Sequence, residues 1–224
     1  MTTNIDKNTI KCAVFDLDGT LLNTIKTINY YLNFALNKNG LAAVSENSCM
    51  AFVGDGAKKL IERALSEVGA DVEEYFDSVF RDYNAAYDAD PYYLTEIYPG
   101  ISELLDKLNR RGIKIAVLSN KPDFATRAAV SHFFGDSFSF VAGAREGVRL
   151  KPEPDALLSI LHYLEVTQSE TVYIGDSETD VLTAKNAEVA RSIIVTYGFR
   201  TRDQLMAAGA EILVDSPEQI PHLI

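Results

Sequence analysis

The sequence has few of the residues that build disulfide frameworks or zinc sites. Of its 224 residues only two are cysteines, Cys12 and Cys49, and three are histidines. Two cysteines fit a protein of a reducing compartment better than a disulfide scaffold. His132, His162 and His222 are scattered, and no second histidine or cysteine stands at the spacing of a zinc site. The composition therefore disfavours disulfide-stabilised and zinc-dependent proteins.

Long apolar runs and positive charge are also scarce. No apolar run approaches the length of a membrane span, and the polar segment 1–8 lacks the apolar stretch of a signal peptide. The formal net charge is −11 and the pI is about 4.7, so no basic face is expected for a nucleic acid. We expect a cytoplasmic monomer or homodimer that binds neither nucleic acids nor membranes.

The most informative stretch is an apolar run that ends in two acids. Residues 14–22 read VFDLDGTLL, which predicts a buried parallel strand with Asp16 and Asp18 facing the same side. Two like charges this close repel each other unless a cation or a shared proton compensates. The pair indicates a divalent metal, with one acid as nucleophile and its neighbour moving protons. Taken alone, the stretch is also compatible with an ordinary acidic turn.

Three further polar sites follow in chain order, each near the end of a predicted strand or the start of a helix. They are Ser119-Asn120 after the strand 114–118, Lys151 in a Lys-Pro-Glu-Pro turn, and Gly175-Asp176-Ser177 after the strand 171–174, with Asp180 one helical turn later. Ligands of parallel sheets bind at the carboxyl ends of the strands. We therefore expect Asp16, Ser119 and Asp176 to meet at one edge of a sheet.

Alternating strand and helix patterns predict an α/β fold. Strand patterns cover about 10–16, 114–118, 138–142, 171–175, 192–197 and 211–214. This alternation predicts a doubly wound, mainly parallel Rossmann-like sheet with right-handed crossovers. Residues 21–92 hold no convincing strand and only helical patterns at 25–36, 57–68 and 72–87, so they should form a separate helical unit. We expect a core domain of residues 1–20 and 93–224 and a cap domain of residues 21–92.

The four polar sites together resemble the four motifs of the haloacid dehalogenase superfamily of phosphatases. The resemblance spans nearly the whole chain and implies an α/β core with an inserted all-α cap that covers the site. Three features are similar to the phosphoglycolate phosphatase branch: the Asp-Leu-Asp-Gly-Thr-Leu stretch, the cap after it, and Tyr98-Pro99-Gly100 where the chain returns to the core. Asn23 departs from this branch, in which many relatives have aspartate.

The resemblance implies roles for the acids. Asp16 would be the nucleophile that forms an aspartyl-phosphate, and Asp18 would be the general acid and then the general base. Asp176, the Asp16 carboxylate and the main-chain carbonyl of Asp18 would hold Mg²⁺, since all-oxygen ligands suit a hard ion.

The resemblance also implies which groups bind phosphate. Ser119, the Asn120 main-chain amide and Lys151 would contact the transferring phosphoryl group. Asp180, with Ser177, would hold Lys151 or the metal-binding loop in place; an ordinary helix acid is the alternative for Asp180.

Three further residues are expected to bind substrate: Thr20, Gly54 and Lys58. Gly54-x-Gly56 resembles the glycine-containing loop of phosphoglycolate phosphatase-like caps. It is not a dinucleotide fingerprint, because a third glycine and a preceding strand are missing. A simple helix-starting turn is the alternative for this loop, and a solvated surface lysine is the alternative for Lys58.

The leading function is a Mg²⁺-dependent phosphomonoesterase that acts on a small phosphorylated metabolite, similar to phosphoglycolate, through an aspartyl-phosphate. A beta-phosphoglucomutase-like phosphotransferase is one alternative, although such mutases tend to have a cap histidine where this chain has Ile28. A pyrophosphatase or nucleotidase of the same superfamily also stays open. Dehalogenases lack an acid at the position of Asp18, and phosphonate hydrolases usually have another residue there, so Asp18 argues against both activities. A non-catalytic binding protein would lack at least one of the motif residues.

Overall fold

The computed structural model describes residues 10–224 and is built around a six-stranded sheet in which every neighbouring pair is parallel. The strand order is β5-β4-β1-β6-β7-β8. The strands are β1 (Cys12–Phe15), β4 (Lys114–Pro122), β5 (Phe140–Ala144), β6 (Thr171–Gly175), β7 (Arg191–Val195) and β8 (Ile212–Val214). The predicted doubly wound parallel fold is confirmed.

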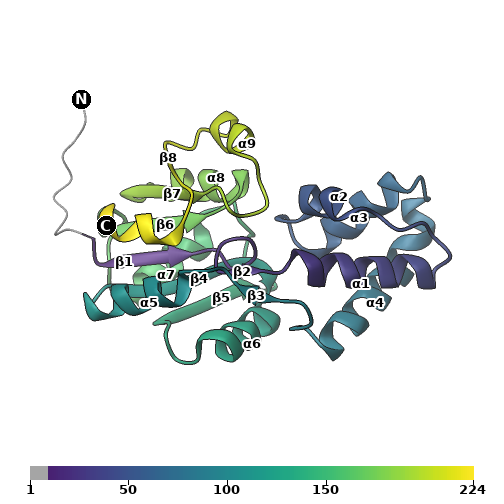
Figure 1. Ribbon diagram of the computed structural model, residues 1–224, viewed down its shortest axis with the longest axis horizontal. Coiled ribbons are helices and arrows are strands. Elements are labelled where there is room, and N and C mark those ends of the chain that lie inside the picture. The colour runs from purple at the N-terminus through teal and green to yellow at the C-terminus, as the bar shows by residue number, and fades with distance from the viewer. Residues whose placement is uncertain (1–9) are drawn as a thin grey trace.

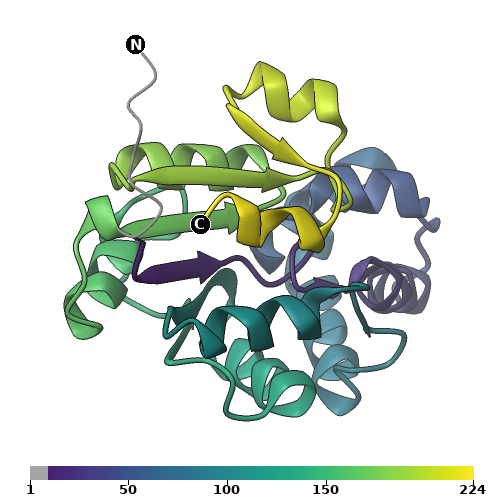
Figure 2. The same ribbon diagram turned by 60° about the vertical axis from the view of Figure 1, so that its left-hand side comes forward.

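Helices cover both faces of this sheet (Figures 1 and 2). They are α5 (Ile101–Arg110), α6 (Asp123–Phe134), α7 (Asp155–Tyr163) and α8 (Glu178–Asn186). The 3-10 helix η2 (Gln168–Glu170) lies between α7 and α8, and α9 (Arg202–Ala207) and the 3-10 helix η3 (Pro217–His222) follow nearer the C-terminal end.

Alternate residues of β1 pack against different helix layers, which explains why the strand is apolar throughout. Ala13 and Phe15 belong to the apolar cluster that contains α5 and part of α6. Cys12 and Val14 belong to the cluster that contains α7 and part of α8. The central strand is therefore buried on both faces.

The chain reverses its direction of travel across the sheet at β1. From β1 it passes to β4 and β5 on one side, and then to β6, β7 and β8 on the other side. Ligands of open α/β sheets bind beyond the carboxyl ends of the strands at such a reversal. The fold therefore directs a ligand to the loops after β1, β4 and β6.

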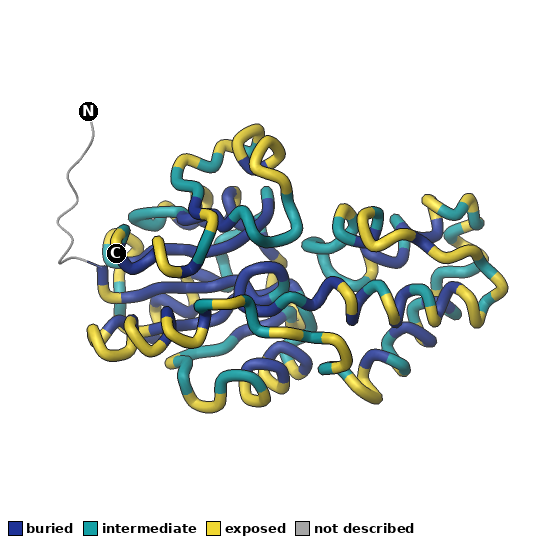
Figure 3. Tube along the Cα trace, viewed as in Figure 1, coloured by how far each residue is buried: buried dark blue, intermediate teal, exposed yellow. Residues whose placement is uncertain are grey.

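The four helices within residues 25–89 form a separate layer beyond this edge of the sheet (Figure 1, right). They are α1 (Ile25–Lys38), α2 (Glu46–Phe52), α3 (Ala57–Glu67) and α4 (Val72–Ala89). Their buried side chains, among them Leu32, Ile61 and Val79, form their own apolar cluster. Buried residues therefore occur both around the sheet and within the layer of α1 to α4 (Figure 3). The predicted helices at 25–36, 57–68 and 72–87 are confirmed as α1, α3 and α4, whereas α2 was not predicted.

The expectation that residues 21–92 hold no strand is wrong at one point. The two-residue strand β2 (Leu22–Asn23) pairs antiparallel with β3 (Glu96–Ile97), so the two segments that join the helices to the sheet lie side by side. A strand of two residues has no repeating pattern, so its pairing partner defines it. Leu21 and Leu22 pack in the apolar cluster of the sheet. The division into domains at residues 20/21 and 92/93 stays a proposal.

Two expectations concern membranes and export. Within residues 10–224, no helix is long and apolar enough to cross a membrane. The segment 1–8, on which the expectation of no signal peptide depends, lies outside the described residues.

Candidate active site

Asp16 directly follows β1, at the carboxyl end of the sheet. Its backbone N–H donates to the Ile174 carbonyl at 2.8 Å, which extends the ladder between β1 and β6. The chain then turns at Gly19, whose φ of +86° is unfavourable for other residues. A Cβ on Gly19 would lie 2.3 Å from Oδ2 of Asp176. The turn therefore packs directly against the loop after β6, and only glycine fits there.

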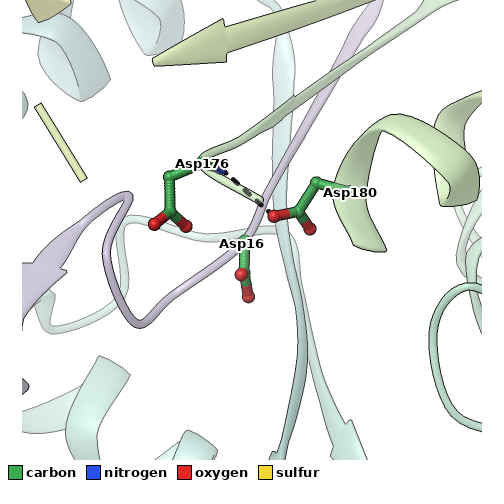
Figure 4. A group of neighbouring side chains, drawn as sticks. All are labelled: Asp16, Asp176 and Asp180. Atoms are coloured by element: carbon green, nitrogen blue, oxygen red, sulfur yellow. Dashed lines mark hydrogen bonds between the residues drawn. The ribbon is translucent and has the colours of Figure 1, made fainter. Parts of the chain in front are cut away.

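Three carboxylates converge in this space. Asp16, Asp176 and Asp180 each place one oxygen within 4.8 Å of the others, and all three are buried. Figure 4 shows them beside one another, Asp16 from the segment after β1, Asp176 from the loop after β6 and Asp180 from the start of α8. The structure thus brings Asp16 and Asp176 to one edge, where the sequence placed them.

Lys151 is the cation at the centre of these acids. Its Nζ lies 2.9 Å from Oδ1 of Asp16 and 2.8 Å from Oδ1 of Asp180, and the residue is 5% exposed. Nζ also donates to the hydroxyl of Tyr173 at 3.2 Å. Tyr173 was not predicted, because in the sequence it is one apolar position of β6. Its hydroxyl donates in turn to Asp180 at 2.9 Å.

Asp180 uses both of its oxygens within the protein. Oδ1 accepts from Lys151 and Tyr173, and Oδ2 accepts from the Ser177 hydroxyl at 2.6 Å and from the backbone N–H groups of Ser177 and Asp176 at 3.1 Å. Burial would raise the pKa of the Asp180 carboxyl, but Lys151 and these donors outweigh burial and lower it. Asp180 therefore contacts both Lys151 and the loop after β6, the two partners between which the sequence left its role open.

The cluster holds more negative than positive charge. Burial raises the pKa of the Asp16 carboxyl well above its ordinary value, against the opposing charge of Lys151. Burial and the charge of Asp180 raise the pKa of Asp176 to about 7. One ammonium thus faces three buried carboxylates, an arrangement that a divalent cation would balance.

The oxygen atoms around this space are suitable ligands for such a cation. Asp176 is oriented by two hydrogen bonds, from the Thr20 hydroxyl at 3.2 Å and from the Phe199 backbone N–H at 2.8 Å. The buried Oδ1 of Asp18 has no hydrogen-bond partner among residues 10–224. A set of carboxylate and carbonyl oxygens suits a hard ion such as Mg²⁺. Thr20, which was expected to bind substrate, is fully buried and contacts Asp176.

A cavity of about 310 Å³ lies between this edge and the helical layer, a size found among small-molecule sites. Its lining contains most of the predicted site residues: Asp16, Asp18, Gly54, Ser119, Asn120, Lys151, Asp176 and Ser177. Lys58 is exposed and does not belong to the lining, and neither does Thr20. The helical layer contributes apolar and aromatic side chains, among them Ile28, Phe80 and Tyr83.

The loop between α2 and α3 closes one side of the cavity. The Asn120 Nδ2 donates to the Gly54 carbonyl at 3.0 Å and to the Lys151 carbonyl at 3.1 Å, while its Oδ1 accepts from the Lys151 N–H at 2.9 Å. Arg200 donates from Nη1 to the Met50 carbonyl and from Nη2 to the Val53 carbonyl, both at 2.6 Å. The sequence indicated the main-chain amide of Asn120 and gave no sign of Arg200, since this arginine follows no recognised motif.

Lys121 is a second lysine with a largely covered side chain, and it was not predicted. Its side chain is 10% exposed, its Nζ donates to the Tyr87 hydroxyl at 2.6 Å, and it lies 3.6 Å from Oδ2 of Asp18. Burial would lower the pKa of Lys121, but Asp18 and Tyr87 outweigh this effect and raise it. The apolar pattern gave no signal for it, because Lys121 lies in the polar end of β4, beyond the apolar run 114–118.

Comparisons with known proteins agree with this geometry. Residues 13–194 match the family model described as haloacid dehalogenase-like hydrolase. The chain is 32% identical over 220 residues to a phosphoglycolate phosphatase of Vibrio parahaemolyticus, with 96% of each chain covered. It is 33% identical over 211 residues to a phosphoglycolate phosphatase of Rhodospirillum rubrum, covering 92% of this chain and 87% of that one. A solved structure described as a predicted phosphoglycolate phosphatase, from Haemophilus somnus, matches with a TM-score of 0.89 at 26% identity, covering 96% of this chain and 98% of that chain.

Proposed function

The chain belongs to the haloacid dehalogenase-like hydrolase family, and from that membership we propose that it is a phosphatase that hydrolyses a small organic phosphate monoester. The observation that carries the proposal is the convergence of Asp16, Asp176 and Lys151 in one cavity with Asp18 beside them. A carboxylate, a cation and a second acid are the groups that a two-step phosphoryl transfer needs.

Asp16 is the nucleophile in this proposal. One carboxylate oxygen attacks phosphorus, the bond from phosphorus to the ester oxygen breaks, and an aspartyl-phosphate forms. Oδ1 of Asp16 accepts from the Leu17 N–H at 2.7 Å and contacts Lys151, so the direction of the carboxylate is fixed before substrate binds. Water then attacks the aspartyl-phosphate, which releases phosphate and restores the carboxylate.

Asp18 moves the protons in both steps. It donates a proton to the departing ester oxygen, and it accepts one from the water that attacks the intermediate. Asp18 lies two residues from Asp16 and lines the same cavity. Its Oδ1 is buried and has no hydrogen-bond partner within residues 10–224, so the protein itself does not use this oxygen.

Ser119 and Lys151 bind the transferring phosphoryl group. The Ser119 oxygen accepts from the Lys121 N–H at 3.2 Å, which leaves the hydroxyl proton free to donate to a phosphoryl oxygen. Lys151 supplies a fixed positive charge in a buried site, where charges interact more strongly than in water. The carboxylates of Asp16 and Asp176 and the main-chain carbonyl of Asp18 would hold Mg²⁺, which would offset negative charge around phosphorus.

The substrate in this proposal is a small phosphorylated metabolite, with phosphoglycolate-like esters as the first candidates. The curated relatives compared above carry the name phosphoglycolate phosphatase. Position 28, where the resemblance places a histidine in mutases of this superfamily, is an isoleucine that lines the cavity. An apolar side chain cannot exchange protons with a sugar hydroxyl, so the hydrolase is preferred over the phosphotransferase.

We also propose a cytoplasmic location. Cys12 and Cys49 are both free and buried, and burial raises the pKa of each thiol to about 12. Neither forms a disulfide, in agreement with a reducing compartment.

Phosphate release from p-nitrophenyl phosphate, with Mg²⁺ and with EDTA, tests the proposal. We expect turnover with Mg²⁺, background rates in EDTA and full recovery when Mg²⁺ is returned, because uncompensated carboxylates would repel the phosphate dianion. A panel with 2-phosphoglycolate, glucose 1-phosphate and nucleotides then ranks substrates. Full activity in EDTA would remove the metal from the mechanism, and folded, Mg²⁺-loaded protein that is inactive on every phosphomonoester would contradict the proposal.

A further inference from the structure

We infer that Lys121 recognises a carboxylate on the leaving group, and that the preferred substrates are phosphate esters of short hydroxy acids. This inference rests on the proposed phosphatase function and adds to it the residue that selects the substrate. Three cationic side chains line the cavity among residues 10–224: Lys121, Lys151 and Arg200. They differ in how many of their N–H groups the protein already uses.

The protein itself uses all three N–H groups of Lys151 and three of the five N–H groups of Arg200, whose charge is also paired with Glu178 at 2.9 Å. All three N–H groups of Lys151 have partners in Asp16, Asp180 and Tyr173. The guanidinium of Arg200 donates to the Glu178 carboxylate at 2.9 Å and to two carbonyls of the α2–α3 region. Lys151 is committed to Asp16 and Asp180 and would act on the phosphoryl group through its charge, and Arg200 is committed to the cap.

Among residues 10–224 the Lys121 ammonium has one hydrogen bond and one longer ion pair, with Asp18. Its Nζ donates to the Tyr87 hydroxyl, and the 3.6 Å separation from Oδ2 of Asp18 is longer than a hydrogen bond. An ammonium carries three N–H donors, so two of them have no hydrogen-bond partner within residues 10–224. A nearly buried ammonium with free donors in a cavity is well suited to binding an anion, because the surroundings screen its charge weakly.

The position of Lys121 assigns it to the leaving group. The transferring phosphoryl group lies near Asp16, Ser119 and Lys151, whereas Asp18 contacts the departing ester oxygen. A group 3.6 Å from the Asp18 carboxylate is therefore beside the departing alcohol. In a glycolate ester the carboxylate is bonded to the carbon that carries the ester oxygen, so it can reach Lys121 while that oxygen faces Asp18.

The cap completes this subsite. Tyr87 of α4 is uncharged. Its hydroxyl accepts a hydrogen bond from Lys121 Nζ, and its ring covers the ammonium, with 4.5 Å from Nζ to the ring centroid. Ile28, Leu60 and Phe80 form apolar walls nearby. These apolar walls favour a short leaving group with one negative charge, which would pair with Lys121. They provide no polar partner for a second charge.

A pair of substrates that differ only in this charge tests the inference. We would compare 2-phosphoglycolate with 2-hydroxyethyl phosphate, in which a neutral CH₂OH replaces the carboxylate. The wild-type protein should have a kcat/KM about 10- to 100-fold higher for 2-phosphoglycolate, the range expected for one charge-assisted hydrogen bond. In Lys121→Met the ratio of the two kcat/KM values should fall to near one, whatever the absolute rates.

Two lysine variants serve as controls. Lys107→Met, on the exposed side of α5, should retain the wild-type ratio. A collapse of the ratio in Lys58→Met, with none in Lys121→Met, would overturn the inference and return the role to the cap lysine. So would a wild-type protein that shows no preference between the two esters.

Binding measured without turnover separates this inference from the proposed function. Calorimetric titration of 2-phosphoglycolate into Asp16→Asn should give a dissociation constant that rises about 10- to 100-fold when Lys121→Met is added. Equal affinities, or no binding to Asp16→Asn, would overturn the inference. Absence of phosphate release from every ester by the wild type would instead refute the proposed function, and the titration would still decide the role of Lys121.

Discussion

Lys151 contacts two aspartates with different roles: Asp16, the proposed nucleophile, and Asp180, which holds neighbouring groups in place. Its two shortest contacts, to Asp16 and Asp180, differ by 0.1 Å (2.9 − 2.8), yet the two carboxylates differ in their surroundings. Asp180 accepts hydrogen bonds on both oxygens, whereas Asp16 lines the cavity. Since a carboxylate saturated by donors is a poor nucleophile, the hydrogen bonds themselves distinguish the two acids.

At this scale the sequence predicts residues well where a motif identifies them. Asp16, Ser119 and Asp176 line one cavity, as expected from the strand ends, and Lys151 from a motif turn lines it as well. Residues outside the motifs were missed, because their roles depend on burial and on partners remote in the chain. Tyr173 is such a case: an apolar strand position reveals nothing of a hydroxyl that meets a lysine and an aspartate.

We predict that Asp16→Asn abolishes turnover and leaves the fold intact. The amide is a far weaker nucleophile, so kcat should fall by at least about 1,000-fold, a loss typical of a nucleophile variant. The substitution also removes one of three clustered carboxylates, so the melting temperature should not decrease. Phosphate release and thermal unfolding measured on the same preparation check both statements, and near-normal turnover would refute the assignment of the nucleophile.

Among the secondary-structure elements, the strand ends decide where the chemistry lies. The strands at 114–118 and 171–175 were predicted from apolar runs, but β4 extends to Pro122 and so carries the polar Ser119-Asn120-Lys121 on its end. An apolar pattern cannot indicate how far a strand continues once its residues become polar. The same limit explains why the short β2 and β3 were missed: their pairing with each other defines them.

The turn after β1 gives a prediction with a matched control. Gly19→Ala and Gly40→Ala both place a side chain at positive φ, +86° and +73°, and each should lose about 1–2 kcal/mol of stability for that reason. Only at position 19 would the new Cβ collide with Asp176, since nothing lies within 4 Å of it at position 40. We expect Gly19→Ala to lose activity and to need more Mg²⁺ for half-maximal rate, while Gly40→Ala stays active.

Chemical unfolding and a Mg²⁺ titration of the rate measure these two effects separately. Equal activity losses in the two variants would mean that backbone strain, and not contact with Asp176, connects this turn to the site.

For the whole molecule, the cavity depends on contacts between the helical layer and the sheet. Asn120 and Arg200 belong to the sheet side and bind carbonyls of Met50, Val53 and Gly54 on the helical side. The order of the motifs predicted a cap over an α/β core. It could not predict which backbone carbonyls hold the cap, because neither partner carries a sequence signal for the other.

We predict that Arg200→Met loosens the cap without unfolding the core. Two hydrogen bonds to cap carbonyls and the ion pair with Glu178 are lost, so amide hydrogen exchange should accelerate in residues 50–56 and KM should rise. Arg202→Met is the control, because Arg202 is exposed and pairs with Asp215 on the surface. Unchanged exchange in residues 50–56 of Arg200→Met would show that other contacts hold the cap closed.

The pairing of β2 with β3 has a consequence for how such a molecule can be assembled. Leu22 lies opposite Ile97 and Asn23 opposite Glu96, so the chain leaves the sheet side at Asn23 and returns at its direct pairing partner, Glu96. A tight hairpin turn could bridge that gap, and excising everything between would leave the order of the large sheet unchanged. Replacing the segment between Asn23 and Glu96 as one insertion would therefore change the side chains that line the cavity from the helical layer and keep Asp16, Lys151 and Asp176 on the sheet side.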